Sequence, residues 1–167
     1  AASAACPLFD AQEPAEVIDK CARLLERADV RRPEAPSLRG AALVRASGAA
    51  GRVGLVRALL GVGADAEHAD ASGRTPLINA CLKGDEPCAR ALLDAGASLE
   101  AADNEGRTAL IVACQNGYEP CARLLLERGA NVDHAMDNGF TALMAACQEG
   151  YEPCARLLLE RGANVDH

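Results

Sequence analysis

The stretch YEPCARLLLERGANVDH at Tyr118–His134 recurs letter for letter at Tyr151–His167, and a looser copy runs from Asp85 to Ala101. The copies are spaced by 33 residues. A unit of this length cannot bury its own apolar face, so it must stack against its neighbours in an elongated array. Such an array has one long surface and no single deep cleft. It therefore favours binding of other macromolecules over catalysis.

Composition and charge narrow the class of protein. The chain has 167 residues, of which 50% are hydrophobic and 25% are charged, as is ordinary for one soluble globular domain. Its aromatic residues are Phe9, Tyr118, Phe140 and Tyr151, so the core must consist of Ala, Leu, Val and Cys. The net charge is −7, with 12 basic against 17 acidic residues from Arg39 onward. Because affinity for nucleic acid depends on Lys and Arg that neutralise phosphates, no nucleic-acid partner is expected.

A membrane-spanning helix is not expected either. The segment richest in Ala and Leu, Ala41–Ala66, is interrupted by Arg45, Arg52 and Arg57. A span requires about 18 or more predominantly apolar residues with few or no charges. The sequence therefore predicts no membrane insertion.

Six of the eight cysteines follow the period, Cys81, Cys114 and Cys147 in one register and Cys88, Cys121 and Cys154 in the other. Their apolar helix positions indicate buried, reduced thiols that act as small hydrophobic side chains. Their spacing matches none of the short zinc-binding pairs, so we expect neither a metal site nor a cofactor. Free thiols favour an intracellular and, by default, cytoplasmic location, and the Ala-rich start leaves a plastid or another organelle as the alternative.

Glycine and proline mark the helices of each unit. A Thr that can cap a helix follows the first glycine column, and Pro76 suits a first helical turn. Pro87, Pro120 and Pro153 open a second helix, each preceded by a Glu that favours the positive helix end. The glycine columns that bound these segments are Gly73, Gly106 and Gly139, then Gly84, Gly117 and Gly150, then Gly96, Gly129 and Gly162.

A short helix, a tight turn, a longer helix and an extended turn in 33 residues resemble the ankyrin repeat. The residues that match the family pattern are Gly73, Thr75, Pro76, Leu77, Ala80, Gly84, Leu92, Leu93, Gly96 and Ala97. The resemblance implies an all-α solenoid of stacked helix-turn-helix units with projecting β-turn or hairpin loops. The expected units are residues 39–69, which are degenerate, then 70–102, 103–135 and 136–167.

The two ends of the array differ. Residues 1–38 are expected to form a tail and an amphipathic capping helix, or a degenerate half repeat, with residues 31–37 as the joint to the array. The last unit keeps Leu157, Leu158 and Leu159 unchanged from an internal copy. Because a terminal repeat usually has a polar outer face, we expect more chain or a partner to cover this end.

One departure from the family concerns how the units hold together. The family commonly has a His after Thr-Pro-Leu, which ties adjacent repeats by hydrogen bonding. Here Ile78, Ile111 and Met144 stand at that position. The sequence therefore predicts that packing must hold the units together.

Comparison of units 103–135 and 136–167 locates a candidate contact surface. Their second halves are identical, whereas the differences cluster in the turn and the first helix. Drift after a recent duplication is the alternative explanation. Phe140 replaces Arg107 and either anchors a partner or packs against Tyr118 or the neighbouring turn. The expected contact residues are Arg74, Lys83, Asn104, Glu105, Arg107, Gln115, Asn116, Asp137, Asn138, Phe140, Gln148 and Glu149.

Three functions follow from this reading. The first is a non-catalytic scaffold or adaptor that binds one or more proteins through the turn tips and the first-helix face. The second is a constitutive structural or linker subunit of a large assembly. The third is the recognition segment of a longer enzyme. The sequence contains none of the common hydrolase, zinc-protease or phosphate-loop motifs, so the chain itself is not expected to be an enzyme.

Overall fold

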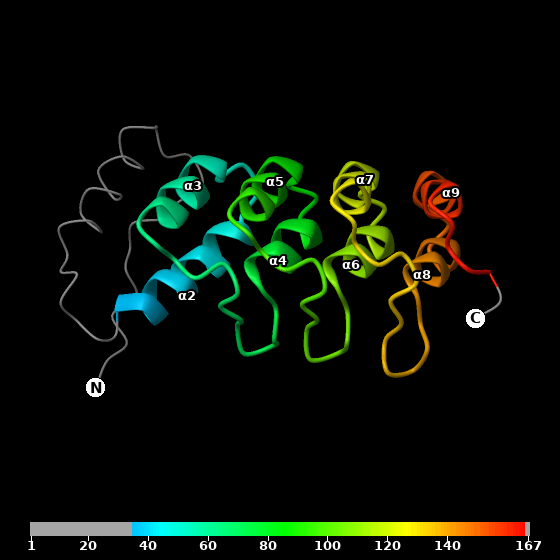
Figure 1. Cartoon of the computed structure of the whole chain (residues 1–167), viewed down its shortest axis with the longest axis horizontal. Helices are drawn as coiled ribbons and strands as arrows, with labels where there is room; N and C mark the ends of the chain where they lie inside the picture. Colours follow the sequence, from blue (N-terminus) through cyan, green and yellow to red (C-terminus); the bar gives the residue numbers. More distant parts are fainter. Residues whose placement is uncertain (1–34, 166–167) are drawn as a thin grey trace.

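The computed structural model describes residues 35–165, which form a stack of helix pairs (Figure 1). One layer contains α2, α4, α6 and α8, the other contains α3, α5, α7 and α9, and each helix packs against its pair partner and the equivalent helix of the next pair. The predicted all-α solenoid is confirmed, with no strand among residues 35–165. The helices are α2 (Ala35–Ser47), α3 (Val53–Gly61), α4 (Pro76–Leu82), α5 (Glu86–Asp94), α6 (Ala109–Gln115), α7 (Glu119–Glu127), α8 (Ala142–Gln148) and α9 (Glu152–Glu160).

The N-terminal side of the array differs in part from expectation. Helix α2 begins at Ala35, inside the stretch that the sequence predicted to be a joint. A proline at position 36 is compatible with a helix start, because the first turn leaves its own N–H groups unpaired in any case. The expected capping helix falls within residues 1–34, which lie outside the described part of the chain.

The helix starts follow the predicted caps with two corrections. Thr75 and Thr141 accept hydrogen bonds from the backbone N–H groups of Ile78 and Met144, each at 3.4 Å. Thr108 makes no such bond, and its buried Oγ1 has no partner among the described residues. The second helices start one residue before the predicted proline, because the preceding Glu is already helical, as in α7.

Glycines end the first helices and also join adjacent repeats. Gly84 and Gly117 have φ values of +67° and +73°, which L side chains rarely adopt. A Cβ atom on either glycine would lie 2.6 Å from the ring of Tyr118 or Tyr151, respectively. Each tyrosine therefore lies over the glycine of the preceding repeat, where only glycine leaves room for the ring.

The first inter-repeat join uses a carboxylate in place of a ring. Asp85 stands where Tyr118 stands one repeat later, and its Oδ2 accepts a 2.7 Å hydrogen bond from the N–H of Gly51. Its Oδ1 accepts from the N–H of Cys88 at 3.0 Å and so caps α5. Burial and then the hydrogen bond to Asp85 raise the pKa of the Cys88 thiol to about 12, so this thiol stays protonated.

The core contains the residue types that the sequence predicted. Leu92, Leu125 and Leu158, at equivalent positions, are completely buried, and small Ala and Cys side chains fill the space between the helices. The thiols of Cys81 and Cys121 share a hydrogen bond between adjacent repeats, and this contact together with burial raises the pKa of Cys81. All six cysteines of the described residues are free.

Cys147 is the exception to the predicted burial, because it is exposed. Its equivalent, Cys114, contacts Cys154 of the next repeat. Among the described residues no further helix pair lies beside Cys147. Leu126, which is followed by another described helix pair, has 9% of its surface exposed. Its equivalent Leu159, which is not, has 50% exposed.

The expectation that packing must hold the repeats together without polar bridges is wrong. A carboxylate at the start of one inter-repeat loop accepts a 2.8 Å hydrogen bond from a backbone N–H of the next repeat. The tie recurs at every step because the loops stack with the same stagger as the helices. The pairs are Glu67 with Ser98, Glu100 with Asn131, and Asp133 with Asn164.

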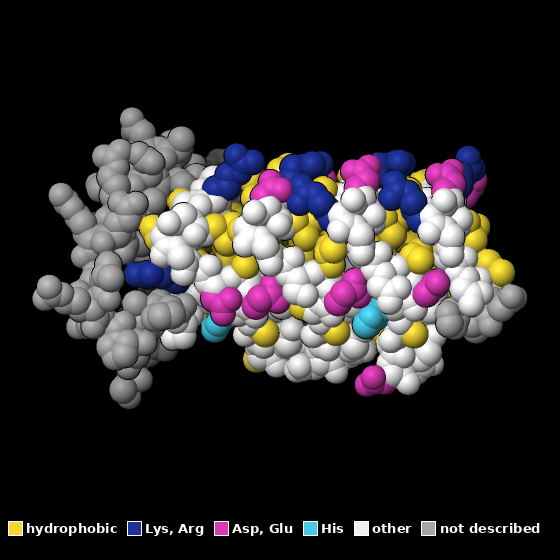
Figure 2. Space-filling view, in the orientation of Figure 1, with side chains coloured by type: hydrophobic (Ala, Val, Ile, Leu, Met, Phe, Trp, Pro, Cys, Tyr) yellow, Lys and Arg dark blue, Asp and Glu magenta, His cyan; other side chains and the backbone are white. Residues whose placement is uncertain are grey.

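The second helices carry ion pairs on their outer side. Arg90 pairs with Glu86, Arg123 with Glu119, and Arg156 with Glu152, each one helical turn apart. Figure 2 shows basic and acidic side chains along the edge of the α5, α7 and α9 layer. None of the helices within residues 35–165 has both the length and the hydropathy that are needed to cross a bilayer.

Candidate functional site

Three loops project from the stack on the side of α4, α6 and α8 (Figure 1). In the first two, an aspartate organises the turn: Asp70 accepts from the N–H groups of Ser72 and Arg74. Asp103 does the same with the N–H groups of Glu105 and Arg107, each at 3.0 Å. We call the three loops, residues 70–75, 103–108 and 136–141, together with the C-terminal ends of α4, α6 and α8, the loop face.

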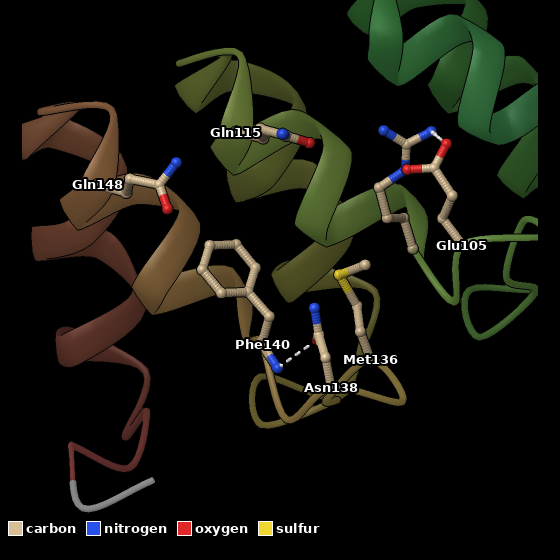
Figure 3. A pocket seen from close by; sticks show the side chains of 7 residues that line it. Glu105, Gln115, Met136, Asn138, Phe140 and Gln148 are labelled. Carbon is tan, nitrogen blue, oxygen red and sulfur yellow. Dashed lines mark hydrogen bonds and ion pairs between the residues drawn. The ribbon is translucent and has the colours of Figure 1, made fainter.

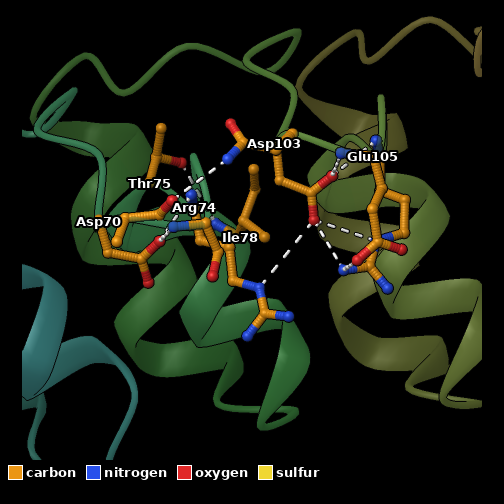
Figure 4. Close-up of polar contacts among 10 residues, drawn as sticks. Asp70, Arg74, Thr75, Ile78, Asp103 and Glu105 are labelled. Atoms are coloured by element: carbon orange, nitrogen blue, oxygen red, sulfur yellow. Dashed lines mark hydrogen bonds and ion pairs between the residues drawn. The ribbon is translucent and has the colours of Figure 1, made fainter.

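Asp103 is also the centre of an ionic cluster (Figure 4). Its Oδ2 accepts from Nε and Nη2 of Arg107 at 3.0 and 2.8 Å, and Nε of Arg74 lies 4.0 Å away. Burial acts to raise the pKa of Asp103, but the hydrogen bonds from Arg107 and from the N–H of Glu105 outweigh it and hold that pKa below its ordinary value. Asp103 is therefore an ionised, buried anchor of the second loop.

The third loop has a different chemistry at the same positions. Met136 replaces Asp103 and Phe140 replaces Arg107, so an ion pair becomes an apolar pair. Asn138 now organises the turn by accepting a 3.0 Å hydrogen bond from the N–H of Phe140. Met136 and Phe140 are both half-buried, which leaves part of each side chain accessible on the loop face.

A pocket of about 360 Å³ lies between the second and third loops. Figure 3 shows the side chains of Phe140 and Met136 rising from the third loop toward the helix ends that carry Gln115 and Gln148. Glu105 lies on the side of the second loop, where its Oε1 accepts from Nη2 of Arg107 at 3.1 Å. The pocket therefore has an apolar floor, amide groups above it and an ion pair at one side.

Six of the twelve predicted contact residues line this pocket, namely Glu105, Arg107, Gln115, Asn138, Phe140 and Gln148. Arg74 belongs to the ionic cluster next to it. Asn104 bonds the preceding loop through the carbonyl of Ala71, and Asn116 bonds the carbonyl of Val112 within its own helix end. Lys83, Asp137 and Glu149 are exposed on the loop face but do not line the pocket.

Met136 was missed from the sequence, although it lines the pocket beside Phe140. The signal was present in the comparison of the repeats, where Asp103 and Arg107 are replaced together by Met136 and Phe140. Two positions four residues apart that change from a charge pair to an apolar pair indicate side chains in contact. The replacement of Asp103 by Met136, considered without that of Arg107 by Phe140, does not indicate a contact residue.

The described residues offer no group of three or more His, Cys, Asp or Glu side chains that would hold a metal ion. The ionisable side chains lining the pocket are Glu105 and Arg107, and they pair with each other. The side chains that line the pocket include no Ser, Thr, Cys, Lys or His. The arrangement is suited to recognition through shape, amides and charge.

The chain is similar to known repeat families over most of its length. A family model described as ankyrin repeats in three copies matches residues 43–136, and a model of the single ankyrin repeat matches residues 138–167. A comparison with curated protein sequences found no match.

Proposed function

Because the chain belongs to the ankyrin repeat family, whose repeats are generally protein-interaction modules, we propose that it is a scaffold or adaptor that binds one or more proteins through the loop face. Ankyrin domains are typically non-catalytic, and the proposal includes no catalytic role for this chain. The twelve residues predicted from the sequence, with Met136 added, are the proposed contact set. A pocket of this size anchors only part of a standard protein interface, and the exposed residues around it would supply the rim.

The observation that carries this proposal is the accessible apolar pair Met136 and Phe140 on an otherwise polar row of loops. The preceding loop shows that an Asp–Arg ion pair fits the same backbone positions. The fold therefore does not require Met and Phe here. Aromatic and methionine side chains are enriched at protein interfaces, and aromatic ones are enriched in hot spots, which favours a binding role.

The experiment uses the preceding loop as a template. The double variant Met136→Asp with Phe140→Arg restores the ion pair of the second loop and should fold as the wild type does. Affinity purification followed by mass spectrometry is expected to recover proteins with the wild type and not with this variant. A variant on the opposite side, Arg156→Gln, is the control and should recover the same proteins as the wild type. Equal recovery by all three chains would contradict the proposed surface.

A constitutive structural subunit is the second candidate. The exposed apolar side chains of Leu159 and Val165, with 50% and 68% of their surfaces accessible, favour it, because a permanent neighbour would bury them. Size-exclusion chromatography of the native complex in high salt separates the two candidates. An adaptor that relies on polar contacts should dissociate, whereas a constitutive subunit should not.

The proposal also includes the cellular compartment of the chain and, as an alternative, its attachment to a catalytic domain. The free thiols favour a reducing, cytoplasmic compartment, with an organelle as the alternative. Fluorescence microscopy of the tagged protein tests this. Attachment to a catalytic domain in a longer protein is tested by sequencing the complete transcript.

A further inference from the structure

We infer that the pocket between the second and third loops receives an arginine or lysine side chain of the partner protein. This inference rests on the proposed protein-binding function and specifies its chemistry. It follows from three properties of the pocket: its free acceptors, its apolar floor and its charge.

Three side chains of the pocket offer acceptor oxygens that no hydrogen bond within residues 35–165 engages, namely Glu105, Gln115 and Gln148, and they lie beside unengaged N–H groups of Asn138 and Arg107. Only one carboxylate oxygen of Glu105 is engaged, by Nη2 of Arg107, and 63% of the Glu105 side chain is exposed. Gln148 donates its Nε2 to Glu149 at 3.1 Å, which leaves its carbonyl oxygen available. Among the hydrogen bonds of residues 35–165, none engages the second oxygen of Glu105 or the side chain of Gln115. An incoming donor would therefore find several acceptors together.

The floor suits the stem of a long cationic side chain. Arginine and lysine carry three and four methylene groups, which lie favourably along apolar surface while the charged head reaches polar groups. Phe140 offers a ring face to the cation, and Met136 extends the apolar surface beside it. A head group that follows this floor reaches Glu105 on the other side of the pocket.

The way the charges of the pocket are paired disfavours the other simple occupants. Arg107, the cation lining the pocket, is engaged by Asp103 and Glu105, so a carboxylate or phosphate would have to compete with two carboxylates. An aliphatic side chain would cover Glu105 and the amides without bonding them, which is unfavourable. The net charge of −7 of the whole chain also attracts a cationic segment over longer range.

Within the described array, a carboxylate and an aromatic ring occur together between one pair of adjacent loops. Glu105 is replaced by Ser72 one repeat earlier and by Asn138 one repeat later. Phe140 is replaced by Arg74 and Arg107 in the two preceding loops. The carboxylate and the aromatic ring therefore face the same pocket only between the second and third loops.

The test is an NMR titration of the full ¹⁵N-labelled chain with end-blocked peptides. The probes are Gly-Gly-Arg-Gly-Gly, the same peptide with Lys, and control peptides with norleucine or Glu at the centre. The Arg and Lys peptides are expected to give saturable shifts at Asn138, Phe140 and the side-chain amides of Gln115 and Gln148. The norleucine and Glu peptides should bind about tenfold more weakly or not at all.

Matched variants separate charge from position. Glu105→Gln and Phe140→Leu should each weaken the Arg peptide by about tenfold, whereas Glu127→Gln, which removes the same charge on the far side of the stack, should leave it unchanged. The inference is wrong if the norleucine or Glu peptide binds as tightly as the Arg peptide, if Glu105→Gln binds it as the wild type does, or if no peptide binds. Loss of partner capture by the Met136→Asp, Phe140→Arg variant with full capture by Glu105→Gln would overturn the cationic anchor and leave the protein-binding function standing.

Discussion

At the scale of single residues, the join between adjacent repeats depends on glycine beneath a tyrosine ring. Gly117 has φ +73° and the Tyr151 ring against it. Gly150 has φ +75°, and no atom of the described residues lies within 4 Å of where its Cβ would be. The two positions share their backbone strain and differ in their neighbour. Substitutions at the two positions therefore distinguish the free-energy cost of a positive φ from the cost of a clash with the tyrosine ring.

Gly150→Ala is expected to destabilise the chain by about 1 kcal/mol, because it introduces only a left-handed alanine. Gly117→Ala is expected to cost about 1–3 kcal/mol more, because the new methyl group must also displace the Tyr151 ring. Urea unfolding followed by circular dichroism measures both. Equal destabilisation would show that the ring does not pack on the glycine as described.

Asp103 makes the stability of the array depend on pH. Its lowered folded pKa means that the ionised carboxylate stabilises the folded state above the unfolded-state pKa, and this contribution is lost as the pH falls through the folded pKa. Asp103→Asn should therefore be less stable than the wild type by about 2 kcal/mol at pH 7. The difference should shrink below about pH 4.

Thermal unfolding of both chains between pH 7 and pH 3 checks this expectation. The Asp65→Asn variant is the control, because this exposed carboxylate accepts one local hydrogen bond, from the N–H of Glu67, and pairs with no basic side chain among residues 35–165. A constant difference between wild type and Asp103→Asn across the pH range would contradict the assignment.

A feature that shows at a single position could be predicted from the sequence. A feature that depends on a second residue or on the next repeat could not. The repeat comparison identified Phe140 because the Arg-to-Phe change is visible at one position. It did not identify Met136, because the apolar pair becomes evident only when both ends of the loop are seen together. It also assigned Cys147 to the core, because burial at this position requires a following repeat.

At the scale of the elements, the period and the glycine columns predicted the helices well. Their bounds differ by about one residue at the second helices, since the Glu before each proline is already helical. The ties between loops could not be predicted. They connect residues 31 positions apart, as in Asn131 with Glu100, and depend on the stagger of the stack.

Asp85 makes a second kind of polar contact between repeats. It is buried and accepts from two backbone N–H groups, one in its own helix and one in the preceding repeat. Asp85→Ala removes both hydrogen bonds and leaves the buried N–H of Cys88 without that partner, so it is expected to cost about 2–3 kcal/mol. Asp133→Ala removes a carboxylate with one exposed hydrogen bond, to Asn164, and should cost about 0.5–1 kcal/mol. Denaturant unfolding compares them, and a larger loss for Asp133→Ala would contradict the description.

At the scale of the whole molecule, stability comes from the neighbours of each repeat. Helices α7 and α9 have the same sequence, EPCARLLLE. Among the described helices of their layer, α7 packs between α5 and α9, whereas α9 packs against α7 alone. The exposure of Leu126 and Leu159 reflects this difference. In a stack of this kind, stability is approximately a sum of repeat and interface contributions.

Hydrogen exchange on the 167-residue chain provides a matched comparison. The intrinsic exchange rates of the two identical segments are the same, so any difference reports the fold. We expect the amides of α9 to exchange faster than those of α7, because fewer packed side chains protect them. Mass spectrometry of peptides that include the differing residues before each segment distinguishes the two. Equal protection would contradict the dependence on neighbours.

The central claim is that the loop face around Met136 and Phe140 binds a protein. The most direct measurement is photo-crosslinking in cells with a photoreactive amino acid placed at Asn138 or at Glu127. Asn138 lines the pocket, and Glu127 is exposed at the end of α7 and does not line it. We predict a crosslinked protein partner from position 138 and none from position 127. A partner that crosslinks from position 127 and not from position 138 would contradict the account.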